Sequence, residues 1–172
     1  MGMQRRLVKV LDSTMRMELL ATRDEKRVWY CELLRPYRLD TPFSGEPYVC
    51  ILFANDGSIT SEEQVALSEQ IVCTGCRYAV CAGHGCSRWD DSIDLASVVI
   101  EEQSSPPDDT LVMTSWHEGD SVHEIVHFGL DLTAFSEQKF RRYLVLFVGP
   151  HDALCEEVKK AVQSLWNENG LA

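Results

Sequence analysis

Cysteine, histidine and acidic residues gather in the middle of this sequence, where their spacing matches several kinds of functional site. Four of the seven cysteines follow one another as Cys73-x2-Cys76-x4-Cys81-x4-Cys86. This spacing is similar to a zinc knuckle with Cys81 in place of the usual histidine, and four such thiolates can bind zinc tetrahedrally. The segment between them has the composition of a buried strand, so we favour the alternative that these cysteines are small buried apolar side chains.

A second metal motif lies further along the chain. His123-Glu124-Ile125-Val126-His127 matches H-E-x-x-H, in which two histidines one helical turn apart bind zinc and the glutamate activates water. On a helix whose core side is set by Val122 and Ile125, these polar side chains point roughly 110–150° away from the core, at ~100° per residue. No third ligand is evident. We therefore expect no cofactor, with zinc at either motif as the alternative.

A thiol mechanism is the other catalytic hypothesis, and its candidate residues are Cys86, His117 and Glu118. Cys86 directly precedes a helix that Ser87 would cap, and a thiol at a helix N-terminus becomes more acidic and more nucleophilic. His117 would then be the base. Nearby aspartates oppose a thiolate, so we favour a plain helix cap here.

The turn Gly83-His84-Gly85 suggests a phosphate-binding loop, but Arg88 occupies the place of the third glycine of Gly-x-Gly-x-x-Gly. Asp90 and Asp91 would also repel an anion from the following helix start. A nucleotide site is therefore disfavoured.

The elements that position these residues alternate regularly. Apolar runs predict strands at 48–54, 78–82, 111–115 and 142–148, with helices at 61–74, from Ser87 onward, from Val122, and from Leu154. Ser61 and Gln64 are expected to cap the first helix. Alternating strands and helices predict an α/β fold, a Rossmann-like three-layer sandwich whose mostly parallel sheet has about four strands.

The N-terminal part is less regular. Residues 17–21 and 27–34 are predicted to form a further β segment around a polar turn, and Thr41 to Pro47 is predicted to be a linker. The chain is long enough for one core. We expect a single domain over residues 1–172, with 1–47 as N-terminal extension and linker and 48–172 as the α/β core.

Ligands of open parallel sheets bind beyond the carboxyl ends of the strands. The residues that follow the predicted strands there include Asp56, His84 and the pair His151-Asp152. In the predicted ligand site the acids attract a cationic group and the tryptophans offer flat apolar contact. Its members are Asp56, His84, Cys86, Trp89, Asp90, Asp91, Trp116, His117 and Glu118.

Charge restricts the partners. The net charge of -11 and the pI near 4.8 argue against nucleic acid and against anionic membranes. A small molecule or a basic protein partner is more consistent with an acidic chain. We expect a cytoplasmic protein, because seven cysteines occur without a signal-peptide pattern and no apolar run reaches the roughly 18 residues of a membrane span.

The segments Gly83–Asp94 and Met113–Glu118 resemble those of an uncharacterised bacterial family, a domain of unknown function. The resemblance covers residues 48–150. It implies a compact α/β domain whose characteristic residues lie on the loops after the second and third strands, and it implies no activity or cofactor.

The sequence thus favours a non-catalytic binding or regulatory module with its ligand site at the carboxyl ends of the strands. One alternative is a hydrolase, either thiol-dependent through Cys86 and His117 or zinc-dependent through His123, Glu124 and His127. Another is an acidic protein that binds and neutralises a basic partner. Whether the protein is an enzyme stays open.

Overall fold

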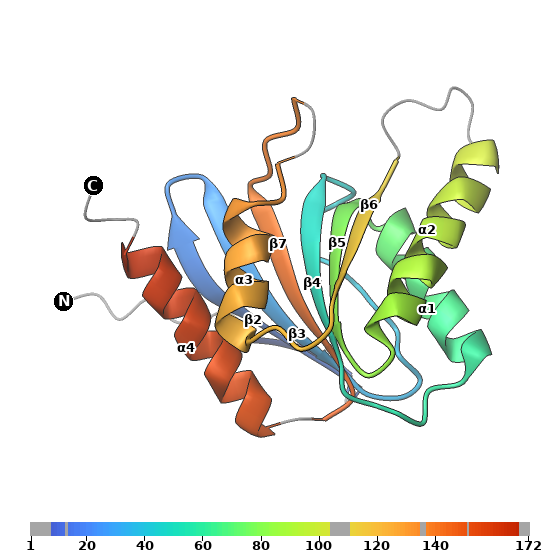
Figure 1. Ribbon diagram of the computed structural model, residues 1–172, viewed down its shortest axis with the longest axis horizontal. Coiled ribbons are helices and arrows are strands. Elements are labelled where there is room, and N and C mark those ends of the chain that lie inside the picture. Colours follow the sequence, from blue (N-terminus) through green and yellow to red (C-terminus); the bar gives the residue numbers. More distant parts are fainter. Residues whose placement is uncertain (1–7, 13, 104–110, 135–136, 151, 169–172) are drawn as a thin grey trace.

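The computed structural model describes residues 8–12, 14–103, 111–134, 137–150 and 152–168, which form one sheet with helices against it (Figure 1). The strands are β1 (Val8–Asp12), β2 (Met15–Arg23), β3 (Lys26–Leu33), β4 (Tyr48–Ala54), β5 (Cys76–Gly83), β6 (Met113–His117) and β7 (Arg142–Val148). The helices are α1 (Ser61–Cys73), α2 (Cys86–Gln103), α3 (Val122–Asp131) and α4 (Asp152–Glu168).

The sheet has seven strands in the order β1-β2-β3-β7-β4-β5-β6. Neighbours from β3 to β6 are parallel, whereas β2 is antiparallel to both β1 and β3. The sheet is therefore mostly parallel, as predicted. The prediction of about four strands was too low, because the N-terminal strands join the same sheet.

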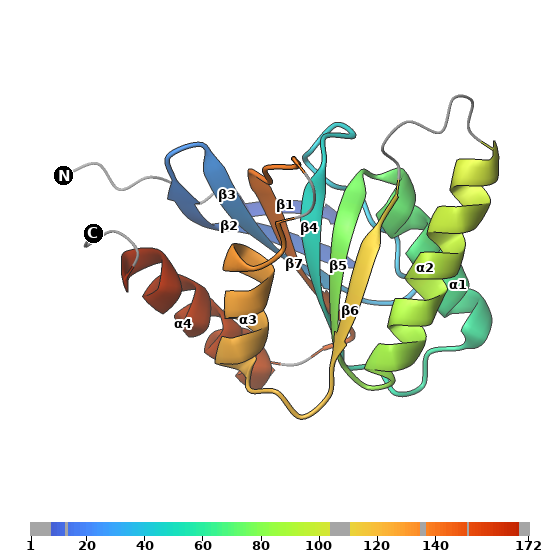
Figure 2. The same ribbon diagram turned by 45° about the horizontal axis from the view of Figure 1, so that its top comes forward.

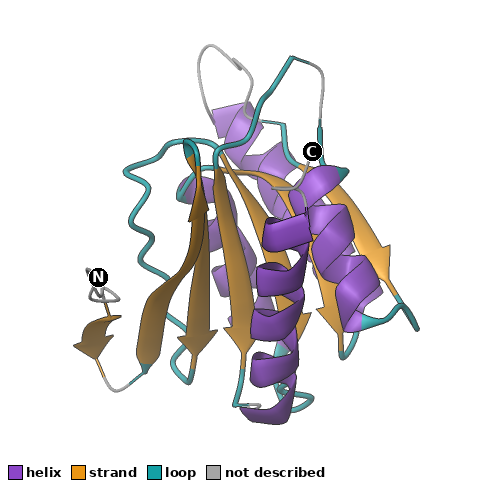
Figure 3. Ribbon diagram, turned by 90° about the vertical axis from the view of Figure 1, so that its left-hand side faces the viewer, coloured by secondary structure: helices purple, strands orange, loops and turns teal. Residues whose placement is uncertain are grey.

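The helices cover both faces of the sheet. Helices α1 and α2 lie on one side, and α3 and α4 lie on the other (Figures 1 and 3). Each face has its own apolar core: Trp89 and Ile93 of α2 belong to the first, and Val126 of α3 and Val162 of α4 belong to the second. The mixed α/β class predicted from the alternation of strands and helices is confirmed.

The central strands β4 and β7 have the bounds that the sequence predicted. All seven residues of β4 are buried, as are six of the seven in β7. Both strands are hydrogen-bonded on each side and covered on each face, so they contain continuous apolar runs in place of an apolar-polar alternation. Such runs are the clearest strand signal in a parallel sheet.

The N-terminal segment contributes to the middle of the sheet as well as to its edge. Strands β2 and β3 form a hairpin, and β3 then pairs in parallel with β7 over seven residues, from Arg27↔Arg142 to Leu33↔Val148. Residues 17–21 and 27–33 thus belong to strands, and the predicted second segment extended one residue too far, to Leu34. The segment predicted to be an extension is joined directly to the α/β core, and residues 1–7 lie outside the described part.

Several predicted bounds differ from those in the structure, including those of β5, which is longer than predicted, and α4, which begins two residues earlier. Strand β6 begins at Met113, so Trp116 and His117 lie inside the strand and only Glu118 follows it. The cap of α1 is Thr60 with Glu63, one residue before the predicted pair. Helix α2 begins at Cys86 and continues to Gln103, beyond the position where a loop was expected to begin, and residues 104–110 are outside the described part.

The carboxyl ends of β4, β5 and β7 meet closely. His84 donates its backbone N–H to the carbonyl of Ala54 at 2.8 Å, and Asp56 donates its own to Val148 at 3.0 Å. Gly83 has a φ of +86°, and a Cβ there would collide with the Ala54 carbonyl. The chain leaves β4 toward β5 on one side and returns through β7 on the other, so these ends form the point where the strand order reverses.

Replacing Gly83 by alanine should destabilise the protein more than replacing Gly85, two residues further on. Both glycines have positive φ, but a Cβ at Gly85 meets nothing within 4 Å. We expect Gly85→Ala to cost about 1 kcal/mol of unfolding free energy for backbone strain. Gly83→Ala should cost about 1–3 kcal/mol more, because the new methyl group overpacks the β4 end. Urea denaturation measures both, and equal costs would contradict the close approach.

Candidate functional site

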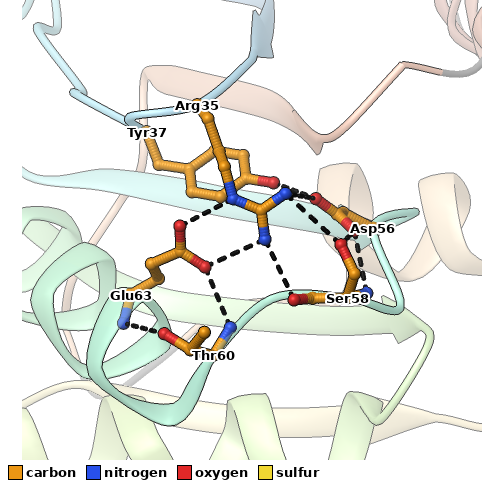
Figure 4. A network of polar contacts seen from close by, with 6 residues as sticks. All are labelled: Arg35, Tyr37, Asp56, Ser58, Thr60 and Glu63. Atoms are coloured by element: carbon orange, nitrogen blue, oxygen red, sulfur yellow. Dashed lines mark hydrogen bonds and ion pairs between the residues drawn. The ribbon is translucent and has the colours of Figure 1, made fainter.

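An arginine between β3 and β4 holds the loops at the carboxyl end of the sheet together (Figure 4). Arg35 forms a two-pronged ion pair with Glu63, Nε to Oε1 at 2.7 Å and Nη2 to Oε2 at 3.0 Å. The same guanidinium donates to the Ser58 carbonyl at 2.9 Å and lies 3.2 Å from Asp56 Oδ2. One side chain thus connects the end of β3, the loop after β4 and the start of α1.

Glu63 has two roles in this network. Its Oε2 accepts the backbone N–H of Thr60 at 2.9 Å, while the Thr60 hydroxyl accepts the Glu63 N–H at 3.2 Å. This reciprocal capping box satisfies two N–H groups at the start of α1. Because the same carboxylate also binds Arg35, the helix start is fixed to the segment after β3.

Both carboxylate oxygens of Asp56 have partners. Its Oδ1 accepts the hydroxyl and the N–H of Ser58 at 2.6 and 2.8 Å, and its Oδ2 accepts the Tyr37 hydroxyl and faces Arg35. The Ser58 hydroxyl, the Tyr37 hydroxyl and the Ser58 N–H lower the pKa of Asp56 to about 2, and Arg35 adds to this. Burial, with the hydrogen bond to Asp56, raises the pKa of Tyr37.

A cleft of about 250 Å³ opens next to this network, at the carboxyl ends of β4 and β5. Its walls come from the loop after β4, the first turns of α1, the turn after β5 and the first turn of α2. The lining residues are Asp56, Gly57, Ile59, Ser61, Gln64, His84, Gly85, Arg88 and Trp89.

Two of the predicted ligand residues, Asp56 and His84, line this cleft. Trp89 only borders it, because its side chain is 1% exposed and packs in the core between the sheet, α1 and α2. The prediction that Trp89 offers an open aromatic face was therefore wrong. Helical spacing of its apolar neighbours, which indicated core packing, was the better signal.

Asp90 and Asp91 do not line the cleft. Asp90 is buried beneath α2, its Oδ1 has no hydrogen-bond partner, and burial raises its pKa. Asp91 is exposed on the outer side of the same helix. The two acids thus point in different directions and do not form a joint site for a cation with Asp56.

Trp116, His117 and Glu118 lie apart from the cleft, on and after the edge strand β6. His117 is held by Asp120, with Nδ1 2.8 Å from Oδ2, and its ring packs on Phe128 of α3 at 4.7 Å. Trp116 is 57% exposed, and Glu118 is exposed as well. The structure therefore divides the predicted ligand residues between two places.

The thiol pair is not brought together. Cys86 is buried in the apolar core on the α1 and α2 side, while His117 packs against Phe128, which belongs to the core on the other face. The sheet lies between them. Cys86 is also the first residue of α2, so Ser87 lies inside the helix and does not cap it.

The structure places the residues of the two zinc motifs on helices and in the buried core. Glu124 forms a capping box with Ser121, whose hydroxyl and N–H lower the pKa of this glutamate, and His123 points to solvent. His127 faces Asp131 at 3.8 Å. Of the knuckle cysteines, Cys73 is exposed while Cys76, Cys81 and Cys86 are buried. Within the described ranges no group of three metal-ligating side chains is close enough to hold a metal ion.

Sequence reasoning missed the residues that complete the site. Arg35 lies in a segment without any motif, and its partners Ser58 and Glu63 are distant in the chain. Arg88 was noticed only because it replaces a glycine. Arg88 lies one helical turn after Gly85 and faces the loop after β4. This helical position was the feature of the sequence that could have indicated its place in the site.

The geometry defines a mixed α/β domain with a small polar cleft where its strand order reverses. A family model described as "Domain of unknown function (DUF7684)" matches residues 28–165, and the chain belongs to this family. The match begins within β3, earlier than the resemblance suggested. No curated protein and no solved structure matches the chain. Among the described helices, none combines the length and apolar character that a membrane span requires.

Replacing Glu63 by glutamine should reduce the loss of stability in acid. Arg35 and the Thr60 N–H lower the pKa of Glu63 from 4.5 to about 2 on folding. Its stabilising effect is therefore complete above pH 4.5 and is lost as the pH falls toward 2. Because glutamine does not titrate, the unfolding free energy of Glu63→Gln should fall less steeply as the pH decreases across this window. Glutamine can still accept the cap hydrogen bond, so the helix start is retained.

Glu62→Gln is the matched control, one residue earlier on the same exposed helical turn. Denaturant titrations at several pH values would give the slope for each protein. A wild-type slope in Glu63→Gln, or equal slopes in both variants, would contradict the coupling of Arg35 to Glu63.

Proposed function

We propose that this protein is a non-catalytic, Rossmann-like binding module that holds a small ligand with an anionic group in the cleft at the ends of β4 and β5. The supporting observation is the side chain of Arg88. Within the described part of the chain it has no ion-pair or hydrogen-bond partner, and it lines the cleft beside the starts of two helices.

Two helix starts border the cleft, and Asp90 and Asp91, which the sequence predicted to repel an anion from the start of α2, do not line it. Ser61 is the first residue of α1, and Gly85 directly precedes α2, so the positive ends of two helix dipoles border the cleft. Free N–H groups at such ends commonly bind carboxylates and phosphates. His84 lies on the same wall and would add a donor or a positive charge.

The state of Asp56 argues against a cationic ligand in this cleft. Both of its carboxylate oxygens already accept hydrogen bonds, and the guanidinium of Arg35, which Asp56 shares with Glu63, lies 3.2 Å from Oδ2. A cation would have to displace these partners. The sequence led us to expect a ligand with a cationic group, and we propose an anionic ligand in its place.

The same carboxylate argues for binding over catalysis. With its pKa at about 2, Asp56 is a weak base near neutral pH. The cleft is also below the roughly 300 Å³ at which pockets for drug-sized molecules begin. A small carboxylate or phosphate compound fits it best. A cytoplasmic location is part of the proposal, because all seven cysteines are free and six of them are buried.

Titration of isotope-labelled protein with inorganic phosphate and with acetate would test the cleft by nuclear magnetic resonance. Saturable shifts are expected in the backbone amides of Ser61 and of Gly85 to Arg88. Arg88→Gln should weaken the response about tenfold, the loss expected when a charged hydrogen-bond donor is removed from an anion.

Arg77→Gln is the control, since Arg77 lies on β5 at the opposite end of the strand and its side chain binds its own neighbour's carbonyl. It should leave the shifts unchanged. Equal binding by Arg88→Gln and wild type, or shifts that centre on Trp116 to Glu118, would refute the proposed site.

A further inference from the structure

Strand β6 leaves one edge of the sheet open. In the part of the chain that the structure describes, β6 pairs only with β5, through Tyr78↔Met113 to Ala82↔His117. Figure 2 shows this strand at the border of the sheet, next to α2. Its outward N–H and C=O groups form a template on which another strand can pair.

This edge lacks the features by which proteins usually prevent such pairing. The sequence Met-Thr-Ser-Trp-His of β6 contains no lysine or proline, and its pairing with β5 runs without a bulge. The opposite edge differs, because β1 contains Lys9 and an irregular register between Val10 and Asp12. Lysine residues and β-bulges are common features that prevent an edge strand from pairing with another chain.

Two exposed apolar side chains, Val98 of α2 and Trp116 of β6, form an apolar strip beside the open edge. Seven large apolar side chains are exposed in the described residues, and five of them lie on α2 or at β6: Leu95, Val98, Val99, Leu111 and Trp116. Trp116 is on the α2 side of the sheet, since it pairs with Cys81, which faces that core. A strand added to β6 would cover part of this strip.

The contact between α2 and β6 fixes the position of the strip. Thr114 donates its hydroxyl to Asp94 at 3.0 Å, so this part of α2 borders the strand. Val98 is one turn further along, rotated roughly 40° outward from Asp94 at ~100° per residue. Val98 and Trp116 therefore flank the open edge on the same side.

The stretch of sequence that contains β6 is strongly acidic. Residues 89–138, which include most of α2 and all of β6 and α3, hold twelve of the 27 acidic residues and none of the 16 lysines and arginines. The rest of the chain, with fifteen acidic and sixteen basic residues, is nearly neutral. The negative net charge of the protein thus belongs almost entirely to the part of the sequence that contains β6.

We propose that the outer edge of β6 and the adjoining α2 surface bind an extended, lysine- or arginine-containing segment of another protein by β-strand addition. Main-chain hydrogen bonds to β6 supply affinity, and apolar side chains at alternate positions contact Val98 and Trp116. Basic side chains face the acids around them. A second copy of this chain fits poorly, because a symmetric interface would bring two acidic surfaces together. This surface is separate from the cleft and does not depend on its ligand.

A fluorescent peptide of alternating lysine and valine, added to the full chain, tests the inference by anisotropy. Saturable binding that weakens with added salt is expected. The same peptide with N-methyl groups on alternate amides keeps all charges but cannot form a ladder on one side. It should bind at least about tenfold more weakly.

Two valine variants locate the surface. Val98 on α2 and Val65 on α1 are exposed to 47% and 46%. A lysine therefore adds the same charge at a similarly exposed position in either variant. Val98→Lys should weaken peptide binding about tenfold, as expected for a central contact. Val65→Lys should bind like wild type, and near-ultraviolet circular dichroism would show that both variants are folded.

Three outcomes would overturn the inference. Equal binding of the N-methylated peptide would show attraction by charge alone. Equal affinities of Val98→Lys and Val65→Lys would place the peptide elsewhere. A dimer in sedimentation experiments that Val98→Lys dissociates would identify a second copy as the occupant.

Discussion

The complete burial of β4 is the constraint on which the rest of this structure depends. Its seven residues are covered on both faces, and β5 and β7 pair with both of its edges. Polar groups are therefore possible only where the strand ends, and the chain places Asp56 there. Because β5 and β7 run parallel to β4, their ends arrive at the same level, at Gly83 and Gly149. The cleft and the Arg35 network result from this meeting of strand ends.

Local patterns predicted the buried elements well and the edges poorly. Strands β4 and β7 have continuous apolar runs, and their bounds were correct. Strand β6 was displaced by two residues, because an edge strand with one open side has no strong apolar pattern and the exposed Leu111 resembled its start. The order of the strands in the sheet could not be predicted from local sequence patterns, because pairs such as Arg27 and Arg142 join residues far apart in the chain. Such long-range pairs are set by packing, for which one sequence contains no local signal.

The positions of two predicted site residues followed from topology alone. Asp56 and His84 follow parallel strands, so they reached the same edge, as expected. Trp116 also lies near a strand end, but β6 is at the border of the sheet and the Trp116 side chain is exposed. The network around Arg35 was not predictable, because a bidentate ion pair to Glu63 depends on how two distant segments pack. The glutamate of the H-E-x-x-H pattern belongs to a capping box, because helix capping uses the same residue types as catalysis.

The distribution of the cysteines has a practical consequence. Six of the seven are buried, and burial raises the pKa of the Cys76 thiol to about 12, with Cys31, Cys50 and Cys81 shifted in the same direction. Thiol reagents attack the accessible thiolate, which leaves Cys73, at the end of α1, as the group that reacts in the folded protein. The native chain therefore contains a built-in attachment point for a single spectroscopic label, and the number of thiols that react reports directly whether the sheet is intact.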